Sequence, residues 1–311
     1  MRSGPQGLAK VLGWYTTGRH AAAALRRLNV APDVLYSYWG NAATVGLAVW
    51  KTKVPSCRAV CRVHRYDVYS ELHDPPFFPF REACFPQLDQ VHCVSRDAVR
   101  VLSQDVPDAN VCYSPLGVER GSGRPKLPGS KVVVCSCSAV VAVKRVDLIA
   151  RSVCRFAAEQ CREVVWIHFG DGPYLEDVRR LATDECPGNL TVELRGRIRN
   201  ADIRSFYADN AVSVFVNLSA SEGVPVSMME AISEGIPILA TNVGGVSDIV
   251  NRATGVLLPK TPSPADAAEG MARVVHEFDS LERRQAVVEQ FRKHWDAETN
   301  FEAFARKLCN E

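Results

Sequence analysis

The sequence predicts an α/β protein with two parallel sheets, and two observations support this. Runs of four to seven residues rich in Val and Ile alternate with helical segments along most of the 311 residues. This alternation is typical of parallel sheets that helices cover on both faces. Near the middle of the chain, residues 119–130 (ERGSGRPKLPGS) hold three glycines and two prolines without an apolar cluster. Such a segment is typical of a linker, so we expect one sheet on each side of it.

The first half begins with a predicted helix over 6–29, where apolar residues recur at helical spacing. A later helix is predicted to begin at Ser95, with Asp97 in its first turn. A serine side chain can cap the free amides of a helix start, and the helix dipole favours an acid there. An Ala-rich helix is predicted over 41–51, and strands over 33–39, 58–64, 90–95 and 110–118.

The second half repeats the alternation more regularly. Strands are predicted over 131–138, 163–170, 189–196, 212–219, 237–242 and 254–259. Helices are predicted over 146–160, 174–185, 202–209, 227–234 and 247–251, and most of 264–308 is predicted to be helical. In open parallel sheets, ligands bind beyond the carboxyl ends of the strands, so the loops after these strands are where chemistry is expected.

Composition and charge exclude several classes of protein. Apolar residues make up 47% of the chain, which is enough for a large core, and the net charge is only +2. Nucleic-acid-binding proteins usually carry a much larger basic excess, so no nucleic-acid partner is predicted. The longest apolar stretch, 132–143, is too short to span a bilayer. The first twenty residues lack the apolar core and cleavage site of a signal peptide.

The eleven cysteines are odd in number and include no CxxC pair. We therefore expect buried free thiols, Cys93 and Cys135 among them, in a reducing cytoplasm. Cys57, Cys61 and His64, with His73 beyond them, fit no common zinc spacing, so no metal is predicted there.

The loop after the predicted strand 212–219 carries the most specific pattern. A helix is expected to begin near Val226 or Ser227, and its free amides would form an anion site. Glu222 precedes that helix and Glu230 lies about one turn into it. An ionised carboxylate can accept from both hydroxyls of a vicinal diol, so the pattern suits a nucleoside diphosphate sugar. The alternative is that both acids only offset a helix dipole on a solvated surface.

Residues 221–245 (SEGVPVSMMEAISEGIPILATNVGG) resemble the donor-site signature of the family 4 glycosyltransferases. Three further segments resemble that family in the same order: 137–147 (CSAVVAVKRVD), 166–173 (WIHFGDGP) and 194–198 (LRGRI). The resemblance covers 130–258. It implies the GT-B architecture of two facing Rossmann-like domains and retaining transfer of a hexose from a nucleotide diphosphate donor, most simply UDP-linked. No Asp-x-Asp occurs in the chain, which agrees with a metal-independent enzyme without a cofactor.

The resemblance also implies roles for individual residues. Glu222 would bind the hydroxyls of the transferred sugar, Glu230 the ribose diol, and Lys144 the diphosphate, where a flexible cation can stabilise the charge of the leaving group. The remaining donor-site candidates are backbone or neighbouring groups: Gly223, Val226 and Ser227 at the helix start, Gly196 and Arg197 at the nucleotide base, and Arg145.

Two departures from the family pattern concern Arg145 and the first domain. The family usually has an arginine five residues before the lysine, where this chain has Ala139. Arg145 is the candidate substitute, although its side chain is expected to point elsewhere. In the first half, RVHRYD (62–67) resembles a His-Gly-Tyr-Asp turn whose histidine lies near the transferred sugar, which makes His64 the third catalytic candidate. Arg65 stands where the family has a small residue, and the alternative for His64 is an ordinary surface turn.

The chain begins with a helix, where the family has a strand and a Gly-rich loop. We therefore predict an incomplete, acceptor-side Rossmann-like domain over 1–122, a nucleotide-sugar-binding domain over 130–285, and a helix over 286–311 that packs back across the domains.

The predicted reaction is hexose transfer to a hydroxyl acceptor in polysaccharide or glycolipid biosynthesis. A glycan or lipid-linked acceptor is implied by the family alone, and it suggests a cytoplasmic protein with peripheral contact at the inner membrane face. Two alternatives stay open: a nucleotide-sugar-binding protein without transferase activity, and a sugar-nucleotide epimerase.

Overall fold

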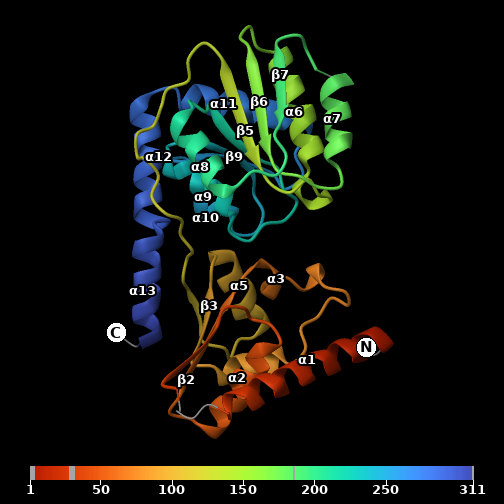
Figure 1. Cartoon of the computed structure of the whole chain (residues 1–311), viewed down its shortest axis with the longest axis vertical. Helices are drawn as coiled ribbons and strands as arrows, with labels where there is room; N and C mark the ends of the chain where they lie inside the picture. The colour runs from red at the N-terminus through yellow and green to blue at the C-terminus, as the bar shows by residue number, and fades with distance from the viewer. Residues whose placement is uncertain (1–3, 28–31, 185, 310–311) are drawn as a thin grey trace. The chain divides into compact units, whose positions relative to one another are not determined.

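The computed structural model describes residues 4–27, 32–184 and 186–309. The chain divides into two compact units (Figure 1). Unit 1 comprises residues 1–115 together with 301–311, and unit 2 comprises 116–300.

Unit 1 contains a parallel sheet of four strands in the order β1-β2-β3-β4. Its core lies between this sheet and its helices, and includes Val63, Phe85, Val91 and Leu102. The strands are β1 (Val34–Ser37), β2 (Arg58–Val63), β3 (Gln90–Cys93) and β4 (Val111–Tyr113). The helices are α1 (Pro5–Leu25), α2 (Ala43–Lys53), α3 (Arg65–Val68), η1 (Ser70–Leu72), α4 (Arg81–Cys84), η2 (Phe85–Gln87) and α5 (Arg96–Asp105).

Helix α1 packs on α2, and α2 packs on strands β1 and β2. The two helices approach closely because glycines lie at their contact. A Cβ atom on Gly18 would come within 2.6 Å of the Val45 Cβ, and one on Gly46 within 2.6 Å of the Ala21 Cβ. These two positions leave no room for a larger side chain. Helix α1 thus forms a layer outside α2.

The end of the chain completes unit 1. Helix α13 (Ala297–Cys309) begins in unit 2, and its residues from 301 onward belong to unit 1. The Phe304 ring lies 5.3 Å from the Tyr36 ring and 4.9 Å from the His92 ring, between centroids. The Arg62 guanidinium is buried 3.9 Å from the centre of the Phe304 ring. This aromatic and cation–π packing fixes the last helix against the sheet.

Unit 2 contains a parallel sheet of six strands in the order β7-β6-β5-β8-β9-β10. This is the strand order of the Rossmann fold, in which the direction of winding reverses beside the first strand. The strands are β5 (Val132–Cys137), β6 (Val164–Phe169), β7 (Leu190–Leu194), β8 (Val214–Asn217), β9 (Ile238–Thr241) and β10 (Gly255–Leu258).

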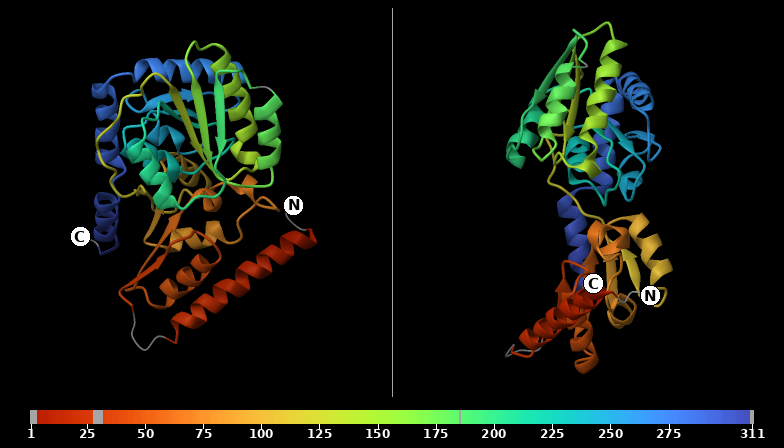
Figure 2. Two further views of the ribbon diagram at one scale, coloured as in Figure 1. Left: turned by 45° about the horizontal axis from the view of Figure 1, so that its top comes forward. Right: turned by 90° about the vertical axis from the view of Figure 1, so that its right-hand side faces the viewer.

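Helices cover both faces of this sheet (Figure 2). Helix α6 lies beside α11 on one face, and α8 and α9 lie on the other. The helices are α6 (Val146–Ala158), α7 (Leu175–Asp184), α8 (Asn200–Asp209), α9 (Val226–Ser233), α10 (Val246–Ile249), α11 (Pro264–Glu277) and α12 (Leu281–His294), with the short η3 (Ala142–Lys144).

The predicted α/β class with two parallel sheets is confirmed. The Ser95 cap is also confirmed, because the Ala98 amide donates to the Ser95 hydroxyl at 3.0 Å. The helix predicted over 6–29 ends at Leu25, and Leu28 and Asn29 lie outside the described residues. The four short helices between residues 65 and 87 were not predicted. Each has three or four residues, too few to show helical periodicity.

All eleven cysteines are free thiols. Among the described residues, no helix has the length and hydropathy needed to cross a membrane. Residues 119–130 form no helix or strand. They nevertheless contact the rest of unit 2, because Glu234 accepts from the Ser122 amide at 2.8 Å, and Arg120 pairs with Asp296.

Arg284 of α12 anchors that helix to the start of β8. Its guanidinium is 1% exposed and donates to the carbonyls of Phe278, Val212 and Ser213 at 2.9, 2.8 and 3.1 Å. Burial lowers the pKa of Arg284 to about 10, so the side chain remains charged at neutral pH. A buried cation with three carbonyl acceptors is costly to remove, because those carbonyls would lose their donors.

We predict that Arg284→Leu lowers the free energy of unfolding of unit 2 by at least about 3 kcal/mol. The matched control is Arg273→Leu. Arg273 is exposed and pairs with Glu277 one turn away on α11, so its replacement should change the free energy by less than about 0.5 kcal/mol. Urea unfolding followed by tryptophan fluorescence measures both. Equal losses for the two variants would contradict the anchoring role.

Candidate functional site

The reversal of strand order in unit 2 places two loops at the same edge of the sheet. Strands β5 and β8 are neighbours, and the loops that follow them lead to helices on opposite faces. The loop after β5 contains Lys144, and the loop after β8 contains Glu222. Ligands of doubly wound sheets bind at this switch point, beyond the carboxyl ends of the strands.

Lys144 and Glu222 meet at this edge. The Lys144 Nζ lies 2.6 Å from the Glu222 Oε1, and the Asn217 Nδ2 donates to the same oxygen at 3.1 Å. Glu222 is buried, whereas the Lys144 side chain is 25% exposed. Asn217 is the last residue of β8, and its Oδ1 accepts from the Ser219 amide at 3.0 Å. The carboxylate is therefore held by a strand end, while the lysine keeps access to solvent.

Glu230 is buried on α9, four residues after the helix begins. Its Oε1 accepts from the Asn200 Nδ2 at 2.8 Å. Burial raises the pKa of this carboxyl, and the bond from Asn200 and the charge of Arg204 partly oppose that shift. A carboxylate with one defined partner retains acceptor sites for a ligand.

The pKa of Cys137, the last residue of β5, is affected by burial and by the charges of Glu230 and Lys144. Burial raises the pKa of its thiol to about 11; the charge of Glu230 adds to this shift and the charge of Lys144 opposes it. Lys144 follows β5, and Glu222 and Glu230 follow its parallel neighbour β8. The structure thus brings Lys144, Glu222 and Glu230 to one edge of one sheet.

Helix α9 begins at Val226, as predicted, with Pro225 as its N-cap residue. The amides at the start of a helix have no intrahelical acceptor, so those of Val226 and Ser227 are available to an anion. The loop before them is fixed by the Gly245 amide, which donates to the Gly223 carbonyl at 2.9 Å.

Arg145 braces the loops around the site. Its guanidinium donates to the carbonyls of Leu218, Ser219 and Lys260 at 2.5, 2.9 and 3.0 Å. Its backbone is left-handed, with φ of 48°, a conformation that costs a non-glycine residue free energy unless its surroundings fix it. These bonds support a structural role in positioning Lys144 next to it. Contact between Arg145 and a donor stays a prediction.

The loop after β7 contains Gly196 and Arg197. The Gly196 carbonyl accepts from the Gly170 amide at 2.8 Å, which joins the loop after β7 to the loop after β6. Gly196 has φ of 64°, in the left-handed region that favours glycine. Arg197 is exposed. Contact of this backbone with a nucleotide base stays a prediction.

The Gly-Asp-Gly turn at 170–172 has a packing role. A Cβ atom on Gly170 would lie 1.8 Å from the Ser138 carbonyl oxygen, and one on Gly172 would lie 2.4 Å from that of Val140. The turn therefore packs directly against the loop that leads to Lys144, in agreement with its structural interpretation.

His64 lies in unit 1, where it caps helix α3 and its amide donates to the Asp67 Oδ2 at 2.9 Å. Its ring contacts those of Tyr38 and Trp39, at centroid distances of 4.6 and 4.5 Å. Burial and the charge of Arg62 lower its pKa to about 4, so the imidazole is neutral at pH 7. Its Nε2 is buried without a hydrogen-bond partner among the described residues.

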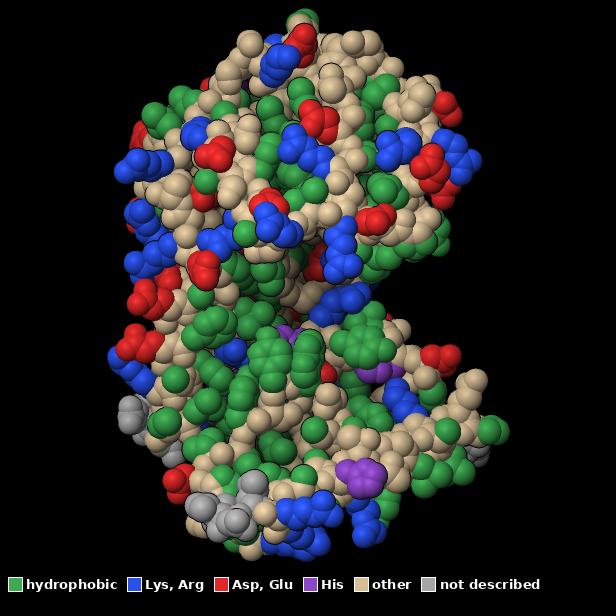
Figure 3. Space-filling view, viewed as in Figure 1, with side chains coloured by type: hydrophobic (Ala, Val, Ile, Leu, Met, Phe, Trp, Pro, Cys, Tyr) green, Lys and Arg blue, Asp and Glu red, His purple; other side chains and the backbone are tan. Residues whose placement is uncertain are grey.

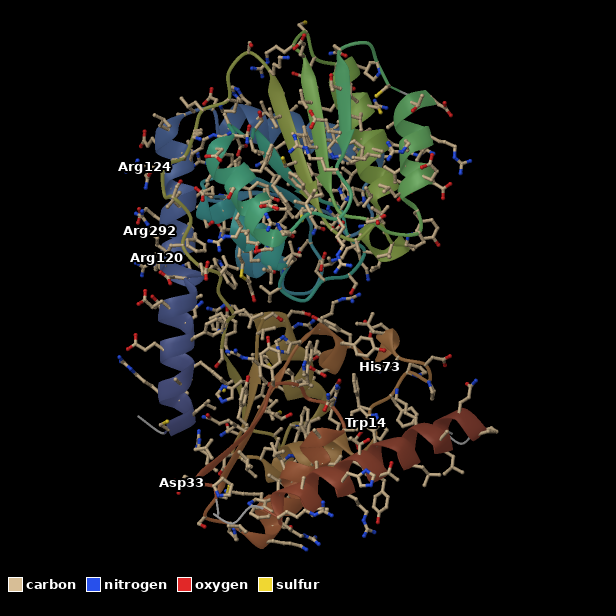
Figure 4. The ribbon with its side chains drawn as sticks, viewed as in Figure 1. Trp14, Asp33, His73, Arg120, Arg124 and Arg292 are labelled. Atoms are coloured by element: carbon tan, nitrogen blue, oxygen red, sulfur yellow. The ribbon has the colours of Figure 1, made fainter. Side chains whose placement is uncertain are left out.

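Unit 1 also has an aromatic pocket, which was not predicted. It has a volume of about 550 Å³. Figure 4 labels two of its residues, Trp14 on α1 and His73 in the loop after η1. The His73 ring lies 4.1 Å from the Tyr66 ring and 4.5 Å from the Phe78 ring, between centroids. The lining residues are Trp14, Thr17, Trp39, Asn41, Ala42, Tyr66, Asp67, His73 and Phe78.

The polar partners Asn217 and Asn200 were also missed, although Asn217 ends a strand, where site residues are expected. The run YWGN at 38–41, directly after β1, was a signal for the aromatic pocket. Asn200 gave no such signal, because its contact with Glu230 spans thirty residues.

The sequence model of the family described as "Glycosyl transferases group 1" matches residues 130–277. That range contains Lys144, Glu222 and Glu230 and the six-stranded sheet. Residues 130–277 are thus similar to the group 1 glycosyltransferases.

Known relatives and structures agree with this assignment. The chain is 24% identical over 289 residues to the Salmonella typhimurium protein named "Putative colanic acid biosynthesis glycosyltransferase WcaL", covering 89% of this chain and 70% of that one. A structure of S. aureus TarM with fondaparinux, α-GlcNAc-glycerol and UDP aligns with a TM-score of 0.70 at 15% identity. Anabaena HepE in complex with UDP gives a TM-score of 0.71 at 15% identity.

The structural alignments cover 94% of this chain and 58% of TarM, and 96% of this chain and 82% of HepE. The chain thus spans just over half the length of TarM. At this level of identity the structures show the fold, which is the GT-B type with Rossmann-like domains.

The two neighbouring basic residues, Arg145 and Lys144, should differ in their effect on stability. We predict that Arg145→Ala lowers the free energy of unfolding of unit 2 by about 1.5–3 kcal/mol, because three carbonyls lose a charged donor. Lys144→Ala should cost less than about 1 kcal/mol, because a partly exposed ion pair contributes little and Asn217 still donates to Glu222. Chemical unfolding without ligand measures both, and a larger loss for Lys144→Ala would contradict this division of roles.

Proposed function

We propose that the chain is a retaining, metal-independent hexosyltransferase of family 4 that uses a UDP-linked sugar. It would transfer the hexose to a hydroxyl of a glycan or lipid-linked acceptor in polysaccharide or glycolipid biosynthesis. The observation that carries this proposal is the ion pair of Lys144 with Glu222 at the switch point of a domain similar to the group 1 glycosyltransferases, with Glu230 on the helix that follows. The UDP named in the TarM and HepE structures supports the choice of nucleotide.

Glu222 and Glu230 suit the two hydroxyl-bearing ends of such a donor. Lys144 and Asn217 both contact the Glu222 Oε1, so the other carboxylate oxygen can accept from sugar hydroxyls. Glu230 shares one oxygen with Asn200 and can accept from the ribose diol. Between them, the diphosphate would lie at the amides of Val226 and Ser227.

Lys144 would leave Glu222 and bind the diphosphate when the donor binds. Negative charge grows on the leaving phosphate as the glycosidic bond breaks, and a cation and helix amides that are by then in place stabilise it without reorganisation. The ion pair with Glu222 holds the lysine at the site before the donor arrives. Catalysis then depends on positioning and charge stabilisation by this chain's own residues.

The aromatic pocket of unit 1 is the candidate acceptor site. Tyr66, His73 and Phe78 present ring faces and edges, on which the apolar faces of a sugar can pack. Asn41 and Thr17 in the same pocket can bond to hydroxyl groups. His64 beside Trp39 is neutral at pH 7, and its role toward the transferred sugar stays a prediction.

We predict that Lys144→Ala and Glu230→Ala each weaken the binding of UDP by about ten- to a hundredfold, because each removes charge-assisted hydrogen bonds. Isothermal calorimetry with UDP measures the affinity. Two control variants should keep the affinity of the parent. Lys131→Ala removes an exposed lysine of unit 2 that pairs with Glu163, and Trp39→Ala alters the pocket of unit 1.

Hydrolysis of UDP-hexose distinguishes a transferase from a binding protein. If the chain is a transferase, the parent should hydrolyse UDP-hexose and Glu222→Gln should do so much more slowly. Tight binding of UDP-hexose without turnover would instead favour the nucleotide-sugar-binding protein. Conversion of one UDP-hexose into its epimer would favour the epimerase. Absence of UDP binding by the parent would refute the proposed donor site.

The binding of UDP should weaken at acid pH through Glu230. Burial disfavours the charged form of this carboxyl, so it takes up a proton at higher pH than an ordinary glutamate and then loses acceptor capacity. Affinity is thus full at neutral pH and falls as pH drops through the raised pKa. Calorimetry at several pH values should show this fall in the parent and not in Glu230→Gln. The titration of UDP itself is common to both and cancels in the comparison.

A further inference from the structure

The aromatic pocket of unit 1 has an acid among its lining residues, Asp67, and among the described residues no Lys or Arg lines it. The first 66 residues, which supply most of its walls, contain ten Lys and Arg and one acid, Asp33. The pocket therefore differs in charge from the basic segment around it. Its aromatic and imidazole rings are those of Trp14, Trp39, Tyr66, His73 and Phe78.

Some of these rings are open to solvent. Tyr66 is 54% exposed and Trp39 is 45% exposed. Figure 3 shows histidine side chains, in purple, next to hydrophobic side chains, in green, on the face of unit 1 in this view. The face of an aromatic ring attracts cations, and tryptophan does so most strongly. A cationic group that enters the pocket can therefore pack on its rings.

Cations already pack on aromatic rings in this part of unit 1. The Lys10 Nζ lies 5.0 Å from the centre of the Phe77 ring, and the Arg81 guanidinium lies 3.2 Å from that of Phe78. Both cations are also bound to backbone carbonyls, Lys10 to that of Pro75 at 2.7 Å and Arg81 to two others. Cation–π packing is thus a feature of the segment that forms the pocket.

Asp67 keeps acceptor capacity for a ligand. Its Oδ2 accepts from the His64 amide at 2.9 Å, and the Gly40 amide also donates to the carboxylate. An ionised carboxylate has about four acceptor sites, so some remain. Burial raises the pKa of Asp67 to about 6, and these two amides and the charge of Arg81 oppose that shift. At neutral pH the group is therefore mainly a buried anion.

His73 supplies a second acceptor. Its Nε2 lies 2.6 Å from the Tyr66 carbonyl oxygen, and this nitrogen carries the proton because a carbonyl can only accept. Burial lowers the pKa of the ring, so the imidazole is neutral at pH 7 and its Nδ1 is an acceptor. Asn41 and Thr17 line the same pocket and can bond to hydroxyl groups.

We propose that this pocket selects an acceptor that carries a primary ammonium group, an amino sugar. The ammonium packs on ring faces and donates to Asp67 and His73, and the sugar hydroxyls bond to Asn41 and Thr17. A quaternary ammonium has no N–H to donate, and a neutral sugar has no charge to match the carboxylate. The inference rests on the proposed function in that it takes the pocket as the acceptor site.

Titration of the full chain with D-glucosamine, D-glucose and N-acetyl-D-glucosamine at neutral pH, followed by tryptophan fluorescence, tests this selection. We expect glucosamine to bind at least about ten-fold more tightly than either neutral sugar, because the ammonium adds a cation–π contact and a charge-assisted hydrogen bond. Asp67→Asn removes the charge at nearly constant shape. It should reduce the preference at least about five-fold and change the affinity for glucose little.

The matched control is Asp33→Asn in the same unit. Asp33 is exposed and does not line the pocket, and Figure 4 shows it well away from Trp14 and His73, so the preference of the parent should persist. Trp39→Leu tests the pocket without touching the acid. It replaces an exposed ring and should weaken glucosamine binding at least about three-fold. Circular dichroism confirms that each variant is folded, and Trp39→Leu decides the test if Asp67→Asn is not.

Equal affinity for glucosamine and glucose, or a preference that persists in folded Asp67→Asn, overturns the inference. Tighter binding of tetramethylammonium than of glucosamine also overturns it, because a quaternary cation gains nothing from the N–H acceptors. Calorimetry with UDP keeps this inference apart from the proposed function. UDP binding without a preference for glucosamine overturns this inference alone, and the preference without UDP binding refutes the proposed donor site alone.

Discussion

The reversal of strand order beside β5 is the constraint on which the candidate site depends. A parallel sheet wound in one direction would send the loops after β5 and β8 to the same face. Here they separate to opposite faces, and the strand ends leave a gap between them. The gap lets a lysine from one loop meet a glutamate from the other at 2.6 Å, although 78 residues separate them in sequence. The site is thus a product of topology more than of any single motif.

The electrostatics of the site follow from burial. Glu222 is buried and pairs with Lys144. Among the described residues no cation forms such a pair with Glu230, and burial raises the pKa of that carboxyl. The two acids therefore have different environments within one edge of the sheet. The bonds that Arg145 makes direct its guanidinium to three backbone carbonyls. Lys144 is then the mobile cation of the loop.

Local signals predicted much of the fold. The alternation of strands and helices, the Ser95 cap and the start of α9 at Val226 each depend on residues close in sequence. Contacts between distant residues were not predictable in the same way. Arg284 donates to carbonyls about 70 residues away, and no periodicity marks such a partner. The sequence of the loop predicted the acids of the site. Asn200 was not predictable, because it contacts Glu230 only when the fold brings α8 beside α9.

The closure of unit 1 by residues after 300 has a consequence for synthesis of the protein. Unit 2 is one continuous stretch of chain, so it can fold as soon as it has left the ribosome. The sheet of unit 1 is made before unit 2, but its Tyr36, Arg62 and His92 receive the Phe304 ring only after all of unit 2 has been translated. The sheet of unit 1 is therefore made before unit 2 but completed after it. Until then, the aromatic surface that Phe304 contacts stays exposed on the nascent chain.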